Sequence, residues 1–333
     1  MVAILPARTP LILPPAVSVS SVFSTDIWAG NNGNGRTIST GTNLSQGLAW
    51  VRNRELEINN ILADPRRGMG YYLYSDFEAA QIFQGASARS VTSMYNGAYA
   101  VGNTLGANRS GYNYVGWSFA ESQRFLKTLT WTGNDVDGRV LTHDLGVPPG
   151  MMWVKAYNVA ESWQCYHRSS DQGTGKFAES FSVDIGTPGD FQAFYRDKDL
   201  NATTFKVSNH PGVNQSGRNY IAYVWAHDPY PDGIIQCGMY TGNGSPSGPD
   251  IHLSWESQYI FIQRLDASGY SYVFDSVRGW NSTTDARLSP EGILVEDTGD
   301  FITSVPTGFS LDTNDNSLNA LNGKYGYMTI KAA

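Results

Sequence analysis

The chain has 333 residues, of which 41% are hydrophobic and 16% are charged, and its formal net charge is −7 at pH 7. This apolar content is enough to bury a core, so disorder is excluded as the dominant state. A negative charge without any basic run argues against nucleic acid and against an anionic membrane surface as partners. No stretch approaches the roughly 20 apolar residues of a membrane-spanning helix.

The first 25 residues differ from the rest of the chain. Their apolar run is interrupted by Arg8 and by four prolines, at positions 6, 10, 14 and 15, so it lacks the continuous apolar region of a secretory signal. The prolines also exclude a helix interior and a central strand, which leaves extended backbone. We expect residues 1–25 to form an extended apolar arm that docks on a neighbouring subunit; a frayed terminus is the alternative.

The remainder of the chain carries landmarks that recur three times, about 105 residues apart. The first landmark is an aromatic residue followed by a Gly-Asn turn, and it occurs at 28–31, 131–134 and 240–243. The second is an apolar strand with a late polar residue, at 48–52, 151–155 and 259–263. The third is a strand that ends in a polar group, at 61–64, 164–167 and 272–275. The fourth closes each copy, at 110–117, 216–223 and 322–328.

These landmark segments are rich in Val, Ile, Tyr, Trp and Phe, and Gly, Asn, Asp and Ser fill the turns between them. Strands of about 5–7 residues between dense turns are typical of sandwiches and jelly rolls. The sequence therefore predicts an all-β fold of three tandem β-sandwich domains behind the arm. The expected domains span residues 26–120, 121–228 and 229–333.

The landmarks resemble a repeat found in bacteriophage virion proteins, frequent in phages of marine and cyanobacterial hosts. The matching stretches are WVRNR at 50–54, WVK at 153–155, FDSVRG at 274–279, SGYNYVGW at 110–117 and SGRNYIAY at 216–223. Such proteins are commonly labelled tail-fibre or structural proteins with a concanavalin A-like lectin/glucanase sandwich. The resemblance implies that fold and a virion location, and it supplies no catalytic residues. The second copy departs from the pattern, because His167 and Arg168 stand where the others have Asp and then Arg-Gly.

Metal and nucleophile motifs are weak in this sequence. The five histidines, at 143, 167, 210, 227 and 252, are never within four residues of one another. Residues 312–316 begin like a calcium-binding loop, but Ser317 and Gly323 occupy the positions where that loop needs Gly and Glu. Cys165 and Cys237 lie in strand-like runs and are expected to be buried free thiols, with a single disulfide between them as the alternative. We predict no catalytic, cofactor-binding or metal-binding residue.

Paired carboxylates are the remaining signal for an enzyme, since glycoside hydrolysis needs two of them on one face. The candidates are Glu55 with Glu57 and Asp135 with Asp137, and both pairs fall in turns that occur in one copy only. The recurring Asp64-x-x-Arg67 and Asp275-x-x-Arg278 are better explained as groups that brace a turn than as ligand contacts.

Aromatic residues divide into two groups. Trp50, Trp153 and Phe261 sit in apolar strands and are expected in the core. Those nearer to turns are candidates for stacking on glycans or on a neighbouring protein, namely Tyr71, Tyr72, Tyr95 and Trp280.

The sequence thus favours a non-enzymatic structural protein of a phage virion. We expect a tail fibre or fibre-like appendage that contributes to host-surface recognition, attached to other virion proteins through residues 1–25. A homo-oligomer is expected, with a trimer favoured by the resemblance, and a host-surface glycan is the expected ligand. A capsid decoration protein and a polysaccharide-degrading virion enzyme are the alternatives.

Overall fold

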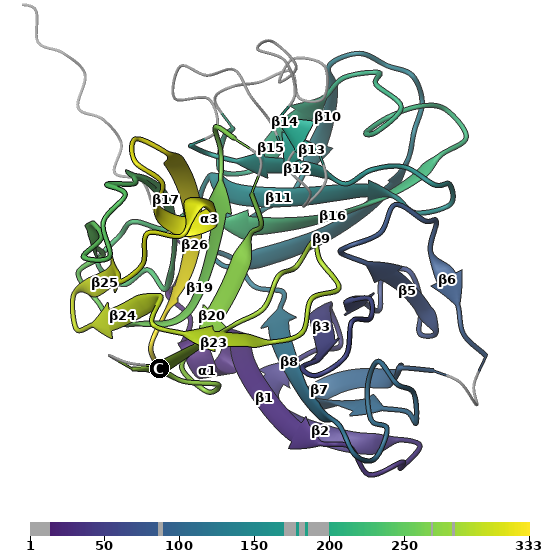
Figure 1. Ribbon diagram of the computed structural model, residues 1–333. Coiled ribbons are helices and arrows are strands. Elements are labelled where there is room, and N and C mark those ends of the chain that lie inside the picture. Colours follow the sequence, from purple (N-terminus) through teal and green to yellow (C-terminus); the bar gives the residue numbers. More distant parts are fainter. Residues whose placement is uncertain are drawn as a thin grey trace, which may run out of the picture.

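The computed structural model describes residues 14–85, 89–169, 178–179, 184–185, 200–267, 269–281 and 284–333. Antiparallel β-strands dominate these residues, and the helices α1 (Val19–Val22) and α3 (Asn316–Asn319) have four residues each. No helix in the described ranges is long and apolar enough to cross a membrane. The predicted all-β sandwich class is confirmed, with several separate sheets packed in layers (Figure 1).

The first sheet has the strand order β1-β8-β3-β4-β5-β6, and β2 pairs with β7 in a separate ladder. These strands are β1 (Phe23–Ala29), β2 (Arg36–Asn43), β3 (Gly47–Asn53), β4 (Ile61–Ala63), β5 (Tyr71–Tyr74), β6 (Ile82–Phe83), β7 (Val91–Val101) and β8 (Asn113–Ala120).

The second sheet has the order β9-β16-β11-β12-β13-β14, and β10 pairs with β15. These strands are β9 (Leu126–Thr132), β10 (Arg139–Thr142), β11 (Pro149–Ala156), β12 (Gln164–His167), β13 (Ala178–Glu179), β14 (Asp184–Ile185), β15 (Thr204–Val207) and β16 (Asn219–Ala226).

The third sheet has the order β17-β26-β19-β20, accompanied by the ladders β18-β25-β24 and β21-β22-β23. These strands are β17 (Ile235–Thr241), β18 (Asp250–His252), β19 (Ser257–Arg264), β20 (Tyr272–Asp275), β21 (Trp280–Asn281), β22 (Thr284–Arg287), β23 (Asp297–Gly299), β24 (Ile302–Val305), β25 (Gly308–Leu311) and β26 (Lys324–Lys331).

The strand order is the same in all three sheets. The first strand pairs with the closing strand, the closing strand with the third, and the third with the fourth. The second strand pairs outside the sheet with the strand that precedes the closing one. The landmark segments of the sequence thus occupy corresponding places. The division into three independent domains at 26–120, 121–228 and 229–333 stays a prediction, because one hydrophobic core runs through the first two sheets and into the third.

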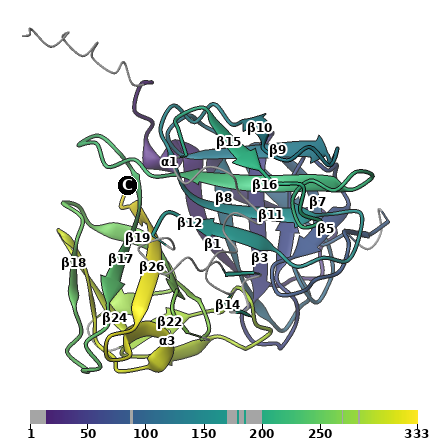
Figure 2. The same cartoon turned by 90° about the horizontal axis from the view of Figure 1, so that it is seen from above.

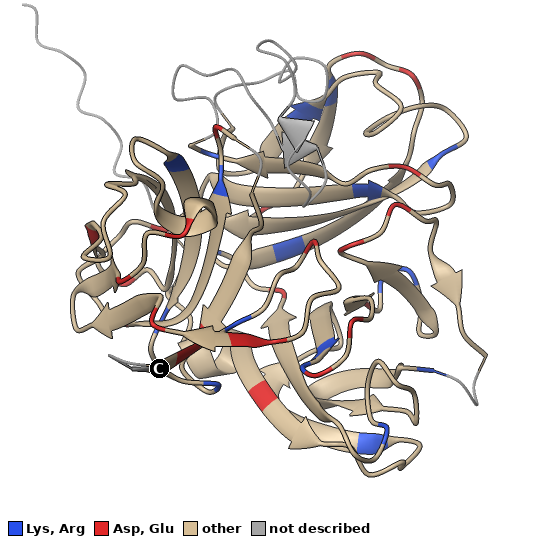
Figure 3. Ribbon diagram, in the orientation of Figure 1, with Lys and Arg blue, Asp and Glu red and all other residues tan. Residues whose placement is uncertain are grey.

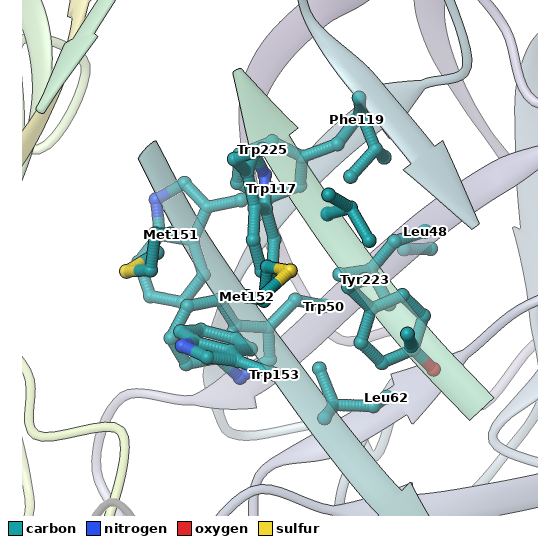
Figure 4. Close-up of a cluster of buried hydrophobic side chains, with 14 of the residues drawn as sticks. Leu48, Trp50, Leu62, Trp117, Phe119, Met151, Met152, Trp153, Tyr223 and Trp225 are labelled. Carbon is teal, nitrogen blue, oxygen red and sulfur yellow. The ribbon is translucent and has the colours of Figure 1, made fainter. Parts of the chain in front are cut away.

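Aromatic side chains from all three sheets meet in this shared core. Trp50 of β3 lies 5.5 Å from Trp153 of β11, and Trp153 lies 5.9 Å from Phe261 of β19, measured between ring centroids. Trp225 of β16 packs 4.5 Å from Trp153, and the close-up shows the rings interleaved between two sheets (Figure 4). All of these side chains are buried, which confirms the prediction that Trp50, Trp153 and Phe261 are core residues. The three sheets therefore pack against one another through this core.

Strand alternation divides the third sheet between two cores. Tyr259 and Phe261 of β19 point into the shared core, whereas Ile260 and Ile262 point into a smaller core with Phe309 of β25. Successive side chains of a strand face opposite sides, so one strand serves both layers. In two perpendicular views, the strands of the third sheet gather on one side of the other two sheets (Figures 1 and 2).

The aromatic-Gly-Asn landmark joins the first strand of each sheet to its closing strand. Its aromatic ring stacks on a tyrosine of the closing strand with an interplanar angle of 15–16° in every copy, and the pairs are Trp28–Tyr114, Trp131–Tyr220 and Tyr240–Tyr325. Each of these tyrosine hydroxyls accepts a backbone N–H from the preceding loop and donates to a carbonyl of that loop. The aromatic residue of the landmark therefore recurs because it packs on a tyrosine that holds the preceding loop.

The Gly-Asn turn has its own steric and polar requirements. A Cβ at Gly133 would collide with the carbonyl oxygen of Gln215, so only glycine fits there. Asn134 and the buried Asn214 bond through their carboxamides at 3.0 Å, and Asn214 also donates to the carbonyl of Val136 at 2.9 Å. The corresponding asparagine pairs at 31 and 108 and at 243 and 319 are bonded in the same way.

The structure describes residues 14–25 of the predicted arm, and these residues contain α1 and the start of β1. Residues 1–13 lie outside the described residues, α1 begins at Val19 and β1 begins at Phe23. Val19, Val22 and Phe23 are buried in the shared core. The Pro14 carbonyl accepts a hydrogen bond from Arg124 Nη1 at 3.1 Å. Residues 14–25 therefore belong largely to the body of the same chain.

Cys165 of β12 and Cys237 of β17 are buried free thiols, as predicted. Burial raises the pKa of both thiols. Both side chains therefore act as small apolar groups in the core.

Substitution of Gly133 by Ala tests the steric requirement of the turn. The new methyl group must displace the 215 carbonyl, so we expect a loss of about 2 kcal/mol in the free energy of unfolding, measured with urea. Gly85→Ala is the matched control, because a Cβ there meets nothing within 4 Å, and it should change stability by less than about 0.5 kcal/mol. Equal stability of the two variants would contradict the assignment.

Candidate functional site

The end of the fourth strand of each sheet contacts the closing strand of another sheet, and we call each such contact a junction. At the first junction, Tyr223 of β16 donates its hydroxyl to Asp64 Oδ2 at 2.8 Å. At the second, His167 Nε2 bonds the Tyr327 carbonyl of β26 at 3.0 Å. At the third, Trp117 Nε1 of β8 donates to Asp275 Oδ2 at 2.9 Å. The junctions run from the first sheet to the second, from the second to the third, and from the third back to the first.

Buried ion pairs brace two of these junctions. Arg67 Nε donates to Asp64 Oδ2 at 2.7 Å, and the Arg67 N–H donates to Oδ1 at 2.9 Å. Arg278 binds Asp275 in the same manner, with its Nε 2.6 Å from Oδ2. The third junction also places the Arg278 guanidinium 5.2 Å from the centre of the Trp117 ring. These pairs brace the turn after the strand, as the sequence suggested, and they also join two sheets.

A second set of buried polar groups reaches from the first and second sheets to loops. Arg52 of β3 donates to the carbonyls of Ile58, at 2.6 Å, and Leu294. Lys155, at the corresponding place in β11, donates to the Glu78 carbonyl at 2.9 Å. Desolvation lowers the pKa of Arg52 to about 10 and that of Lys155 to about 8. Arg52 thus anchors the loop that contains Leu294, and Lys155 anchors the loop that contains Glu78.

One member of each carboxylate pair proposed from the sequence holds a turn. Asp135 has a positive φ of 59° and accepts the Ser216 N–H at 2.9 Å, as Asn32 does for Ser110 at the corresponding position. Glu55 accepts the Asn113 N–H at 3.0 Å, and Asn158 accepts the corresponding N–H of the second sheet at 2.7 Å.

Because asparagine serves at the same place as each of these two acids, neither place requires a carboxylate. Glu57 and Asp137, the second members of the two pairs, are exposed in the same turns.

Four of the five histidines and the acidic loop make contacts within the chain, and His252 is exposed. His143 and His210 accept backbone N–H groups at 3.2 and 3.0 Å, and His227 contacts Arg168. In the loop that resembled a calcium site, Asp312 accepts from Thr303 at 2.6 Å, and Asp315 caps α3. Within the described ranges, no group of three or more His, Cys, Asp or Glu side chains is arranged to hold a metal ion.

The four turn-proximal aromatic residues have different surroundings. Tyr72 is buried in β5 and donates its hydroxyl to the Val91 carbonyl at 2.8 Å, so the prediction that it stacks on an external ligand is wrong. Tyr71 points to the other face of β5 and packs 4.9 Å from Phe83. Tyr95 is exposed, and Trp280 is half-buried against the smaller core of the third sheet.

Two exposed apolar clusters were missed by sequence reasoning. One contains Phe77, Ile82 and Phe83, and the other contains Ile293, Leu294 and Val295. The first cluster lies in the segment from Phe77 to β6, which Lys155 anchors through the Glu78 carbonyl, and the second lies in the loop that Arg52 anchors through the Leu294 carbonyl. We call these two segments the apolar loops. Short apolar runs read as buried strand in the sequence, and only the tertiary structure shows them exposed. Charged residues are sparse on the strands and lie mainly in loops (Figure 3). We take the two apolar loops as the candidate interaction surface.

Comparison with known proteins adds one match. A family model described as a domain of unknown function (DUF7483) matches residues 18–332. No curated protein matches the chain. The match covers all three sheets as one unit, in keeping with the shared core.

Substitution of Asp275 by Ala tests the third junction. The change removes the acceptor of Trp117 and one of the two carboxylates that bond the buried Arg278, and leaves Glu296 as the other, so we expect a loss of about 3 kcal/mol in unfolding free energy. Asp250→Ala, at an exposed position of β18, should cost less than about 0.5 kcal/mol. Trp117→Phe should cost less in the Asp275→Ala background than in the natural chain, and additive costs would show that the two side chains are not coupled.

The second junction predicts a specific pH dependence. Burial lowers the pKa of His167 to about 4, whereas an unfolded histidine titrates near 6.5. Between these values the unfolded chain binds a proton that the folded chain does not, so stability falls as the pH drops from 6.5 to 4. The contribution of His167 amounts to about 3 kcal/mol over this range. Urea unfolding should show a weaker decline for His167→Gln, whereas parallel curves would contradict this origin.

Proposed function

We propose that this chain, which belongs to the DUF7483 family, is a non-enzymatic structural protein of a bacteriophage virion. In this proposal it forms a tail fibre or a fibre-like appendage and contributes to recognition of the host surface. The resemblance of the landmark stretches supports the virion location. The structure supports a scaffolding role, because its three sheets share a core and carry two anchored apolar loops.

The main observation in favour of a structural role is that the acidic and histidine side chains considered for catalysis or ligand binding form contacts within the fold. Asp64, Asp275 and His167 join sheets to one another, and Glu55 and Asp135 hold turns. These groups face partners of the same chain, so they contribute to rigidity. A scaffold of this kind leaves recognition to its loops, as is usual for rigid folds.

Attachment to the particle is proposed to involve other virion proteins. These proteins contact the apolar loops and those of residues 1–25 that are not buried in the shared core, which excludes Val19, Val22 and Phe23. A trimer of the chain is the proposed assembly in a fibre, and light scattering of the purified protein measures it. A capsid decoration protein is the alternative, and it differs by its location on the shell.

Adsorption of phage to host cells tests the role in recognition. Purified full-length protein should block adsorption in a dose-dependent manner, because it occupies the receptor that the virion uses. Gold-labelled antibody against the chain should decorate the tail of the particle. Label on the shell without any block would favour the decoration role, and release of reducing ends from host polysaccharide would contradict the non-enzymatic role.

A further inference from the structure

A small crevice opens beside β4 and β5 of the first sheet. It has a volume of about 240 Å³ and lies between β4, β5, the residues Gln84 and Ser90, and the loop from β7 to β8. Its lining includes Asn59, Tyr74, Gln84, Thr104 and Leu105. This space is below the usual size of a pocket for a drug-sized molecule, and it suits a single sugar ring.

The crevice combines apolar walls with a polar rim. Tyr74 is partly exposed, and the Leu105 side chain is 46% exposed at the mouth. Ile58 and Ile61 complete the apolar lining. A pyranose has an apolar C–H face that packs on such side chains and hydroxyl groups that need polar partners at its edge.

The polar groups on the rim are held in place by the protein. Gln84 Oε1 accepts from the Ser90 N–H and hydroxyl at 3.0 and 3.2 Å, which fixes the carboxamide and leaves its Nε2 as a donor. Asn59 Nδ2 donates to Asp76 at 2.9 Å, which leaves Oδ1 as an acceptor. The Ser90 and Thr104 hydroxyls bond each other at 2.9 Å. The rim therefore offers a donor, an acceptor and a hydroxyl in fixed orientations, and such preorganisation lowers the entropic cost of binding.

The charge of the lining identifies the class of ligand. None of the described residues that line the crevice carries a charge. The charged groups that bond lining residues, Arg52 to Ile58, Arg89 to Gln84 and Asp76 to Asn59, are not themselves part of the lining. A phosphate or a sulfate in the crevice would therefore lose its hydration shell without a cation in the lining to replace it. A neutral group that exchanges hydrogen bonds with amides and hydroxyls does not incur this cost. We propose that the crevice binds one neutral sugar unit, a hexose or an N-acetylhexosamine, of a larger glycan. This inference rests on the proposed function, which supplies a host-surface glycan as the ligand.

Direct binding measurements with free neutral hexoses and N-acetylhexosamines test the site. At least one sugar of the panel should bind the full-length protein and shift the NMR or fluorescence signal of the tyrosine in the crevice. Gln84→Ala should weaken this binding about tenfold through loss of a fixed donor, a typical effect for one hydrogen bond. Leu105→Glu should abolish it, because the variant places a charge at the mouth of the crevice while the exposed position tolerates the change. Gln236→Ala, in β17 of the third sheet, is the matched amide control and should leave binding unchanged.

The outcomes separate this proposal from the virion proposal. Unchanged sugar binding by folded Gln84→Ala and Leu105→Glu proteins would overturn the crevice assignment, as would the absence of binding to every sugar of the panel. If the natural protein blocks phage adsorption and both variants block it equally, the crevice assignment fails and the recognition role stands. If antibody finds no chain in the particle, the virion proposal fails whatever the sugar measurements show.

Discussion

Burial of aromatic rings between three sheets is the constraint on which the rest of the structure depends. Trp153 contacts Trp50 on one side and Phe261 on the other, so each sheet covers a surface that another sheet would otherwise expose. Truncation of a buried tryptophan typically costs about 3–5 kcal/mol, which is a large share of the stability of a whole domain. The landmarks lie on the strands of these sheets, and the braced turns and the anchored loops connect those strands.

Hydrogen bonds at the junctions fix the position of each sheet relative to the next. Hydrophobic contact alone permits sheets to slide, whereas a carboxylate that must meet one indole N–H does not. The junction between Trp117 and Asp275 fixes the third sheet against the first, and the bond between Tyr223 and Asp64 fixes the first against the second. His167 fills the same role with a backbone carbonyl as partner, which explains why the second copy departs from the Asp pattern without losing the contact.

Much of the secondary structure could be predicted from the sequence because its signals are local. The landmarks identified corresponding strands, and Trp50, Trp153 and Phe261 were recognised as core residues from their apolar neighbours. Local patterns failed where burial depends on tertiary structure: Tyr72 and Tyr71 are adjacent and identical in type, yet only one faces the core. The arrangement of the sheets around one core was not foreseen, because the junction partners are separated by as many as 160 residues. The crevice was missed for the same reason, since its lining comes from four separate segments.

The closure of the three sheets has a consequence for synthesis on the ribosome. Trp117 leaves the exit tunnel 158 residues before its partner Asp275. Until β19 and β20 have emerged, the first two sheets display aromatic surface that the finished chain hides. When all three junctions between the sheets have formed, this aromatic surface is covered. Before the third sheet has formed, the same surface can bind another copy of the chain. The nascent chain is therefore most exposed to misassembly with its neighbours on a polysome during the last third of its translation.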